Sequence, residues 1–210
     1  MLNRDEKVKI AVLISGTGTN LQALIDAVEN GSIKNGKISL VISSNKDAYG
    51  LKRASKHGIE NIFIPSEKND RVDNFEKSLT KELRERKIDL IVLAGFMKIL
   101  SEDFVKKYPN RIINIHPSLI PSFCGKGAYG IHVHEMALDY GVKVTGATVH
   151  FVNEIPDGGK IILQKAVEIK EKDTPEILQK RVMREAEWTL LPKAVSMVCD
   201  KIMEEKNESL

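Results

Sequence analysis

The sequence predicts an α/β protein: a single doubly wound, mostly parallel sheet with helices on both faces and a C-terminal helix. Two observations indicate this class. Short apolar runs rich in β-branched residues alternate with longer stretches whose apolar residues recur three and four positions apart. The chain has 210 residues, 42% of them hydrophobic, which is enough for one well-buried core. Because strands joined by helical crossovers run parallel, we expect helices on both faces of the sheet.

Five apolar runs in the first half are typical of buried strands. They occupy residues 9–15, 38–44, 61–65, 90–95 and 111–116. The stretches between them have the periodicity of helices and occupy residues 21–30, 49–58, 72–87 and 101–108. Strand and helix alternate throughout, so we expect this half to be doubly wound.

After residue 116 the pattern changes. A glycine-rich loop leads to a helix expected around residues 134–140, followed by strand candidates at 144–154 and 160–169. The turn sequence IPDGG joins these two strands, and we expect both of them to extend the sheet.

The C-terminal part predicts a last helix that starts near Thr174. Pro192 is expected to bend or interrupt this helix, because proline lacks the backbone N–H and its ring collides with the preceding turn. The polar residues 204–210 are expected to form a frayed tail behind a single domain of residues 1–203.

Composition argues against several classes of function. The 32 basic and 29 acidic residues are mixed along the chain without a basic stripe, so we expect no nucleic-acid partner. Cys124 and Cys199 stand far apart in no metal-binding or redox spacing, which favours free thiols in a reducing compartment. No apolar run approaches the roughly 18 residues of a membrane-spanning helix. The charged first residues lack a signal-peptide core, so we expect a cytoplasmic protein without a membrane partner.

A loop suited to an anion follows the first strand. Residues 15–20 read SGTGTN, and their small side chains allow backbone amides to approach a phosphate at the start of a helix. Leu21 stands where a dinucleotide fingerprint has its third glycine, and the second strand ends in Ser43 and Ser44 rather than in an acid. The Gly-Lys-Ser/Thr ending of nucleoside-triphosphate loops is also missing, so a monophosphate is favoured. The alternative is an ordinary tight turn with an Asn20 cap.

Polar residues gather at the expected carboxyl end of the fifth strand. Asn114 and His116 lie two positions apart, so their side chains share a face where open α/β sheets bind ligands. Asp157, between a proline and two glycines of a later loop, could reach the imidazole. Taken singly, His116 is as well explained by an ordinary core or surface histidine, and IPDGG by an ordinary hairpin turn.

His132, His134, His150 and Cys124 raise a zinc hypothesis, since imidazole and thiolate are the usual ligands of that metal. The spacing of His132 and His134 suits neither one helix face nor a paired-cysteine knuckle. Histidines that form hydrogen bonds around a polar pocket explain the pattern as well, and we expect no metal.

Five segments in order cover nearly the whole chain and together resemble a known family. They are KIAVLISGTGTNLQALID, DLIVLAGFMKILS, RIINIHPSLIPSF, GATVHFVNEIPDGGKIILQ and EAEWTLLP. The set is similar to the phosphoribosylglycinamide formyltransferases of purine synthesis. The resemblance implies one formyltransferase domain over residues 1–203 that passes the formyl group of 10-formyltetrahydrofolate to the amine of phosphoribosylglycinamide. We expect a monomer or a homodimer.

The resemblance also implies the residues of the site. Asn114, His116 and Asp157 match the catalytic residues of the family. The residues implied to hold the phosphosugar are Gly18, Thr19 and Asn20 at the phosphate and Arg184, Glu185, Ala186 and Glu187 at the glycinamide end. The residues implied to form the folate pocket are Arg71, Met97, Lys98, Ile99, Leu100, Asn114, Asn153, Glu154, Ile155, Pro156 and Asp157.

The chain departs from the commoner family pattern in three places. Lys98 stands where many relatives have arginine, so a forked contact to the folate becomes a point charge. Cys124 replaces a frequent proline, and residues 126–130 look like an insertion before the next histidines. We expect none of these departures to change the reaction.

In the mechanism that the resemblance implies, the substrate amine attacks the formyl carbon and the carbonyl oxygen becomes an oxyanion. Asn114 and a protonated His116 supply the hydrogen-bond donors for it. Asp157 is expected to raise the pKa of His116 so that the imidazole can donate near neutral pH. Cys124 and Ser122 have no obvious base as a neighbour in sequence, so no covalent enzyme intermediate is expected.

Three alternatives share part of this pattern. A formyl-folate hydrolase and the catalytic part of a transfer-RNA formyltransferase have the same histidine and aspartate, but each usually carries a further domain, for which this chain has no room. A non-catalytic phosphosugar-binding module would need the phosphate loop, but not Asn114, His116 and Asp157 together.

Overall fold

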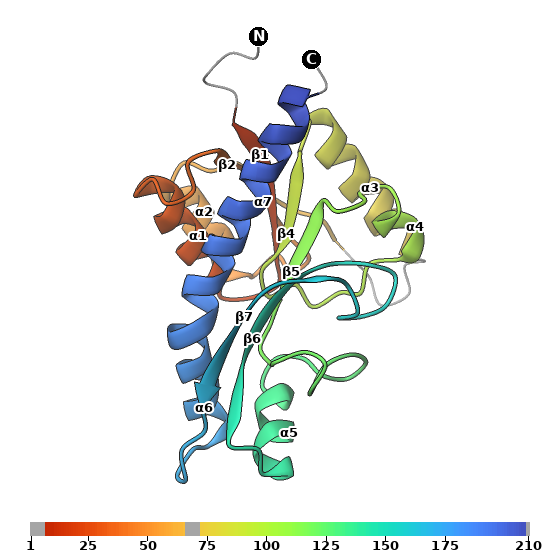
Figure 1. Ribbon diagram of the computed structural model, residues 1–210. Helices are drawn as coiled ribbons and strands as arrows, with labels where there is room; N and C mark the ends of the chain where they lie inside the picture. The colour runs from red at the N-terminus through yellow and green to blue at the C-terminus, as the bar shows by residue number, and fades with distance from the viewer. Residues whose placement is uncertain (1–6, 66–71, 209–210) are drawn as a thin grey trace.

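The computed structural model describes residues 7–65 and 72–208, which form a seven-stranded sheet with helices on both faces (Figure 1). The strands are β1 (Val8–Ile14), β2 (Gly36–Ser43), β3 (Asn61–Phe63), β4 (Leu90–Leu93), β5 (Ile112–His116), β6 (Val144–Phe151) and β7 (Ile161–Glu168). Their order in space is β3-β2-β1-β4-β5-β6-β7. The pairs from β3 to β5 are parallel, and β6 and β7 are added antiparallel. The predicted fold class is therefore confirmed.

Seven α-helices accompany the strands within the described residues. They are α1 (Thr19–Glu29), α2 (Tyr49–Lys56), α3 (Val72–Glu85), α4 (Glu102–Val105), α5 (His132–Tyr140), α6 (Pro175–Val182) and α7 (Trp188–Glu208). A π-helical turn, Met183–Glu187, joins α6 to α7.

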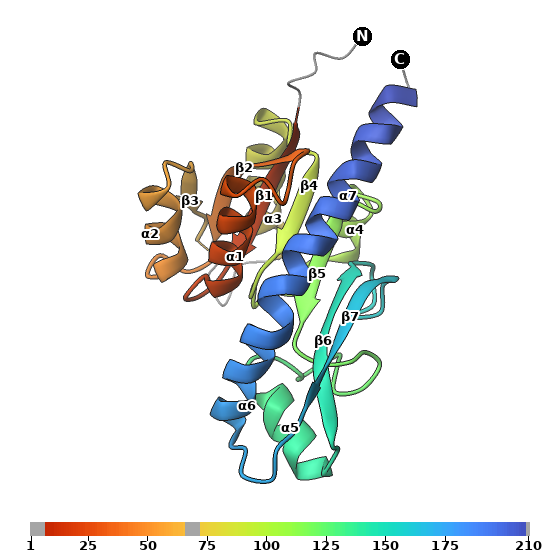
Figure 2. The same cartoon turned by 60° about the vertical axis from the view of Figure 1, so that its left-hand side comes forward.

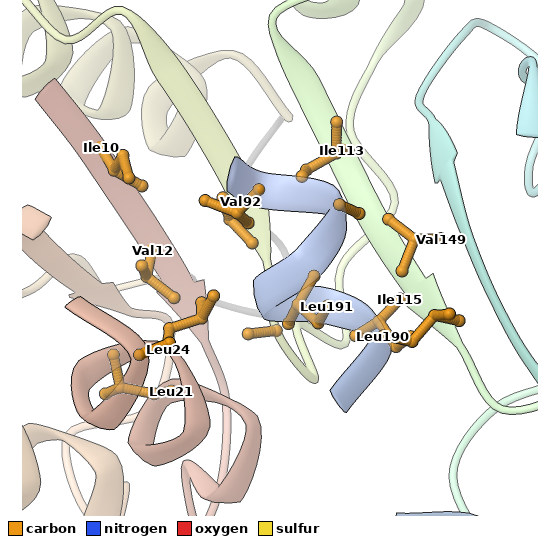
Figure 3. Close-up of a cluster of buried hydrophobic side chains, with 14 of the residues drawn as sticks. Ile10, Val12, Leu21, Leu24, Val92, Ile113, Ile115, Val149, Leu190 and Leu191 are labelled. Carbon is orange, nitrogen blue, oxygen red and sulfur yellow. The ribbon is translucent and has the colours of Figure 1, made fainter. Parts of the chain in front are cut away.

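The two faces of the sheet are buried under different helices, and β1 shows how its sequence does this. Ile10 and Val12 point to the face covered by α1 and α7, while Ala11 and Leu13 point to the face covered by α3 and α4. Figure 2 shows α1 and α7 on the same side of the sheet. Figure 3 shows their leucines meeting the strand side chains. A strand buried on both faces must be apolar at nearly every position, which explains why the apolar residues of β1 follow one another without alternation.

The order of the strands places a topological switch point between β1 and β4. The chain moves outward from β1 to β2 and β3, then returns to the other side of β1 to form β4 and β5. At such a switch point the loops after neighbouring strands diverge, and the carboxyl ends of the strands border an open space. The loops after β1, β4 and β5 all emerge at this edge, which makes it the expected place for a ligand.

Two helices differ from the sequence expectation. The helix expected at 101–108 is only the four residues of α4, because the chain must turn back through Asn110, whose φ is 56°, to begin β5. The helix α7 continues to Glu208 instead of fraying at residue 204. Its end is tied down by ion pairs from Arg111 to Glu205 and from Lys206 to Asp89.

The interruption of the last helix lies before Pro192 rather than at it. Pro192 is inside α7, one turn from its start, where the missing N–H removes only the hydrogen bond that would close the first turn. The irregular part is the π-turn of residues 183–187. Such widened turns are frequent at functional sites.

Candidate active site

The predicted phosphate loop is an open turn between β1 and α1. Gly18 occupies the N-cap position with φ 71°, a left-handed conformation that glycine adopts readily, and no side chain caps the helix. The amides of the first turn of α1 have no acceptor within the helix and point out of its N-terminus. The alternative of a turn with an Asn20 cap is therefore not observed. The geometry favours the anion-binding interpretation.

Asn20 instead turns into the protein and binds the carboxylate of the π-turn. Its Nδ2 donates to Oε2 of Glu187 at 2.7 Å, and both side chains are buried. Burial raises the pKa of Glu187, and the hydrogen bond from Asn20 only partly offsets this. The structure thus joins two segments that are 167 residues apart and that the resemblance assigns to opposite ends of the same substrate.

The other residues of the π-turn are placed differently. Ala186 is buried beside Glu187, whereas Arg184 and Glu185 are exposed on the same turn. Only the last residue of the predicted segment reaches the phosphate loop through a side-chain hydrogen bond. Arg71 lies outside the described residues.

Asn114, His116 and Asp157 come together as predicted. Asn114 and His116 lie on β5, and Asp157 reaches them from the loop between β6 and β7. His116 Nδ1 lies 3.6 Å from Asp157 Oδ2, and Asn114 Nδ2 lies 3.5 Å from Asp157 Oδ1. Both distances are long for a hydrogen bond, as is common for catalytic groups before a substrate is bound.

The charges of this group differ in one respect from the sequence expectation. Burial raises the pKa of Asp157, but the neighbouring His150, His116 and the Gly125 amide outweigh it and hold that pKa below its usual range. Burial lowers the pKa of His116, and the Asp157 carboxylate and the Phe123 carbonyl raise it only in part. Asp157 therefore acts in the expected direction, but the expected rise in the pKa of His116 is not observed because burial outweighs it.

The loop that carries Asp157 is fixed by its backbone. Asp157 itself has a φ of 56°, and its Oδ2 accepts the Gly125 amide at 2.9 Å. A Cβ on Gly159 would lie 1.7 Å from the carbonyl oxygen of Phe151, so only glycine fits there. The IPDGG segment is thus both a hairpin connection and the support of a buried carboxylate.

His150 and Phe123 belong to the site although the sequence did not assign them to it. His150 pairs across from Asn114 on the neighbouring strand β6, and its Nε2 lies 3.6 Å from Asp157 Oδ1. The backbone carbonyl of Phe123 lies 2.9 Å from His116 Nε2. The sequence allowed His150 to be a zinc ligand or a histidine that forms hydrogen bonds around a polar pocket, and these contacts agree with the second alternative; its register against β5 cannot be read from the sequence. A backbone carbonyl leaves no signal in the sequence at all.

The segment assigned to the folate follows β4 at the same edge. Met97 and Ile99 are exposed, as is Ile155 of the opposing loop, while Leu100 is buried. Such a group of exposed apolar side chains beside a polar site suits a flat, partly apolar ligand. Lys98 Nζ lies over the Phe75 ring at 5.2 Å.

Ser15 connects this segment to the phosphate loop. Its Oγ accepts the Met97 amide at 3.0 Å and contacts Ser44 Oγ at 2.9 Å. Asp157 is preceded in the same loop by Asn153, Glu154 and Pro156. Within this loop Asn153 Oδ1 accepts a hydrogen bond from the Ile155 amide at 3.1 Å. The predicted donor and acceptor regions are therefore adjacent.

The histidines and cysteines do not form a metal centre among the described residues. Within residues 7–65 and 72–208 no three His, Cys, Asp or Glu side chains surround a point that could hold a metal ion. Both cysteines are free; burial raises the pKa of Cys124, and it raises that of Cys199 to about 12. Neither thiol is activated as a nucleophile. In the same part of the chain, no helix has the length and apolarity to cross a bilayer.

Comparison with known proteins adds independent observations. A family model described as formyl transferase matches residues 8–195. A phosphoribosylglycinamide formyltransferase of Haemophilus influenzae is 43% identical over 185 residues, which cover 88% of this chain and 84% of that protein. The trifunctional purine biosynthetic protein adenosine-3 of Gallus gallus is 46% identical over 192 residues, 91% of this chain, but the chain spans only 18% of that protein.

A solved structure has the same fold. Glycinamide ribonucleotide transformylase 1 from Symbiobacterium toebii matches with a TM-score of 0.87 and 39% identity, over 96% of this chain and 92% of that one. At this identity and coverage, the similarity is one of sequence as well as of fold.

Proposed function

The chain belongs to the formyl transferase family and, within it, to the phosphoribosylglycinamide formyltransferases of de novo purine biosynthesis, and we propose how its site performs the transfer. We propose that the donor is 10-formyltetrahydrofolate and the acceptor is the amine of phosphoribosylglycinamide, with formylglycinamide ribonucleotide and tetrahydrofolate as products. The predicted family and enzyme class are confirmed. The roles of individual residues given below are our proposal.

The acceptor binds between the phosphate loop, residues 15–20, and the π-turn, residues 183–187. Backbone amides of Gly18, Thr19 and Asn20 hold the phosphate at the N-terminus of α1, where the helix dipole favours negative charge. Glu187, with Arg184 to Ala186 nearby, holds the glycinamide end. The hydrogen bond between Asn20 and Glu187 supports this assignment, because it fixes the two ends of the acceptor site relative to each other.

The donor binds beside it, between residues 97–100 and residues 153–157. The exposed Met97, Ile99 and Ile155 side chains suit the ring system of a folate, which would cover them. Lys98 supplies a positive charge at this pocket, where many relatives have arginine. Arg71 remains a prediction from the resemblance.

The single observation that carries the chemistry is the convergence of Asn114, His116 and Asp157 at the end of β5. The amine nitrogen forms a bond to the formyl carbon, and the carbonyl electron pair moves to the oxygen. One hydrogen of the Asn114 amide points to His150, and the second faces Asp157 Oδ1 across a long 3.5 Å contact, which it exchanges for this oxyanion. Donors held in place before the reaction stabilise the developing charge at little cost in reorganisation.

His116 is the second donor, through Nδ1, whose contact with Asp157 Oδ2 at 3.6 Å is too long for a hydrogen bond. Its two ring nitrogens face a carbonyl and a carboxylate, which are both acceptors, so hydrogen bonding suits the imidazolium while burial opposes it. An oxyanion forming nearby adds negative charge and shifts this balance toward the protonated ring. Protonation of His116 is thereby favoured most in the transition state, which is the condition for catalysis.

The last step returns the proton. The bond between the formyl carbon and the folate nitrogen breaks, and its electron pair stays on that nitrogen. The surplus proton of the amine leaves through the Asp157 carboxylate or a water next to it and reaches the departing nitrogen. No metal and no covalent enzyme intermediate is part of this proposal.

A coupled assay tests the function. Purified protein is given 10-formyltetrahydrofolate with and without phosphoribosylglycinamide, and release of tetrahydrofolate is measured. Release that depends on the amine is expected. Release without the amine would instead indicate a formyl-folate hydrolase, and binding of the phosphosugar without any turnover would indicate a non-catalytic module.

A further inference from the structure

Helix α2 supports the phosphate loop from behind. The Gly50 amide donates to the Gly16 carbonyl at 3.1 Å, and Arg53 Nε donates to the Thr17 carbonyl at 2.9 Å. The helix comes this close because both sides are glycine: a Cβ on Gly18 would lie 2.7 Å from the Gly50 Cα. Two successive carbonyls of the loop are therefore held on the α2 side.

These contacts decide where the amides of the loop point. In a trans peptide the C=O of one residue and the N–H of the next point in opposite directions. The only cis peptide among the described residues is Ile120–Pro121, so the Thr17–Gly18 peptide is trans. Because Arg53 holds the Thr17 carbonyl toward α2, the Gly18 N–H points away from α2, to the open side of the loop.

Arg53 also carries a charge that nothing in the described part of the chain neutralises. Its two hydrogen-bond acceptors are the Thr17 carbonyl and the Gln22 Oε1, at 2.9 and 3.1 Å, and both are neutral. No carboxylate among residues 7–65 and 72–208 forms an ion pair with it. Its guanidinium lies over the Tyr49 ring at 5.1 Å. The segment 15–20 contains no charged residue, so Arg53 is a source of positive charge next to the loop for a bound anion.

We propose that Arg53 is a positioning residue for the substrate phosphate, which aims the Gly18 amide at the anion and polarises it through the Thr17 carbonyl. A hydrogen bond from a cation to a peptide carbonyl makes the N–H of that peptide a stronger donor. The inference rests on the proposed function, since it requires a phosphorylated acceptor. It adds to the site a residue that touches neither the reacting atoms nor the folate.

Substitution of Arg53 should be tolerated by the fold. Arg53 is half-buried and borders, with Thr19, a cavity of about 670 Å³ between α1 and α7. Little packed surface is therefore lost with it. Arg53→Met keeps the apolar stem of the side chain, and Arg53→Gln is a second variant in case the first is unstable. Lys52→Met is the matched control, because Lys52 is exposed, lies over the same Tyr49 ring at 5.9 Å and forms no side-chain hydrogen bond with the described loop residues 15–20.

The experiment compares two acceptors, phosphoribosylglycinamide and its phosphate-free riboside, in the wild-type enzyme and in these variants. Loss of a charge-assisted hydrogen bond predicts a KM for phosphoribosylglycinamide about 10- to 100-fold higher in Arg53→Met. The maximal rate and the KM for the folate should change little. With the phosphate-free acceptor, Arg53→Met and the wild type should have the same kcat/KM, and Lys52→Met should behave as the wild type throughout.

Three results would overturn the inference. They are an unchanged KM for phosphoribosylglycinamide, an equal loss with both acceptors, or a similar loss in Lys52→Met. The first would remove Arg53 from the site, the second would make its role merely structural, and the third would leave only a general effect of charge. Failure of the wild-type enzyme to formylate phosphoribosylglycinamide would contradict the proposed function instead, so the two failures are distinguishable.

Discussion

Asn114 and His150 face each other on the antiparallel strands β5 and β6, and the Asn114 amide donates to His150 Nε2 at 3.2 Å. The other ring nitrogen, Nδ1, donates to the Phe151 carbonyl at 2.8 Å, because a carbonyl can only accept. This fixes the tautomer, with the proton on Nδ1 and a lone pair on Nε2. His150 therefore orients the amide that we propose as an oxyanion donor.

Replacing His150 tests this relationship. His150→Leu removes the acceptor, so the Asn114 amide loses its fixed orientation and the maximal rate should fall roughly 3- to 10-fold, as for one neutral hydrogen bond. His150→Gln retains a side-chain oxygen and should recover part of the rate. Steady-state kinetics with both substrates measures this. A rate that is unchanged in His150→Leu would mean that Asn114 is oriented by other contacts.

Glu187→Gln should make the protein more stable but weaken its binding of the acceptor. The pKa of Glu187 is raised by burial, so its contribution to stability is present below the ordinary pKa and is lost as pH rises through the raised value. Glutamine is uncharged at every pH and can still accept from Asn20. We expect a gain of roughly 0.5–2 kcal/mol in the free energy of unfolding near pH 8, typical of relieving strain at a functional site.

The same Glu187→Gln variant should have a higher KM for phosphoribosylglycinamide, because it lacks the carboxylate proposed to hold the glycinamide end. Denaturant unfolding at pH 5 and pH 8, together with the two KM values, checks both effects. A variant less stable than the wild type at pH 8 would show that the buried carboxylate is stabilising after all.

His134 should make the protein sensitive to acid. It is buried, neither ring nitrogen has a partner among the described residues, and burial together with the nearby His116 lowers its pKa to about 4. In the unfolded chain His134 binds a proton near pH 6.5. The stability that the neutral His134 contributes to the folded protein is therefore present above that pH and is lost as pH falls. From pH 7.5 to pH 4 the loss amounts to about 3 kcal/mol.

His134→Leu should remove that part of the acid destabilisation, as measured by urea unfolding across this pH range. His132→Gln is the control, because His132 lies on the same helix α5 but is exposed and paired with Glu135 at 2.6 Å. If the wild type and His134→Leu lose stability in parallel, His134 is not the group that titrates.

Gly159→Ala should damage the loop that carries Asp157. The added methyl group would come within 1.7 Å of the Phe151 carbonyl oxygen, so the backbone must move. We expect a loss of roughly 1–3 kcal/mol in stability, as for other overpacked sites. The maximal rate should fall at least 10-fold, since a small displacement of a catalytic group is costly. Thermal unfolding and steady-state kinetics measure both, and a fully active variant would show that the position of Asp157 does not depend on this turn.

Much of the fold could be predicted from periodicity, because a strand such as β1 that is buried on both faces is apolar at successive residues. The end of β5 could also be predicted, since Asn114 and His116 share a face by the alternation of a strand. The boundaries of several elements are not determined by periodicity. The short α4 and the π-turn before α7 depend on how the chain must turn in three dimensions, and this leaves no periodic signal.

Other parts of the site depend on contacts between distant segments. His150 joins the site through the register of β6 against β5, and Asn20 meets Glu187 across 167 residues. Arg53 donates to the backbone carbonyl of Thr17, and Phe123 contacts His116 through its own backbone carbonyl. Every residue has such a carbonyl, so the residue types do not indicate these contacts. The pKa of His116 depends on the extent of burial, which the residue types alone did not indicate.

The measurement that tests the central claim most directly is the kinetics of Asp157→Asn. The variant keeps the shape of the side chain but removes the charge that favours the His116 imidazolium and that can carry the proton. The account predicts a maximal rate lower by roughly 10² to 10⁴, the usual range for loss of acid–base function. Both KM values should stay within a few-fold, because the lost interaction strengthens in the transition state. A maximal rate within a few-fold of the wild type would contradict the proposed roles of Asp157 and His116.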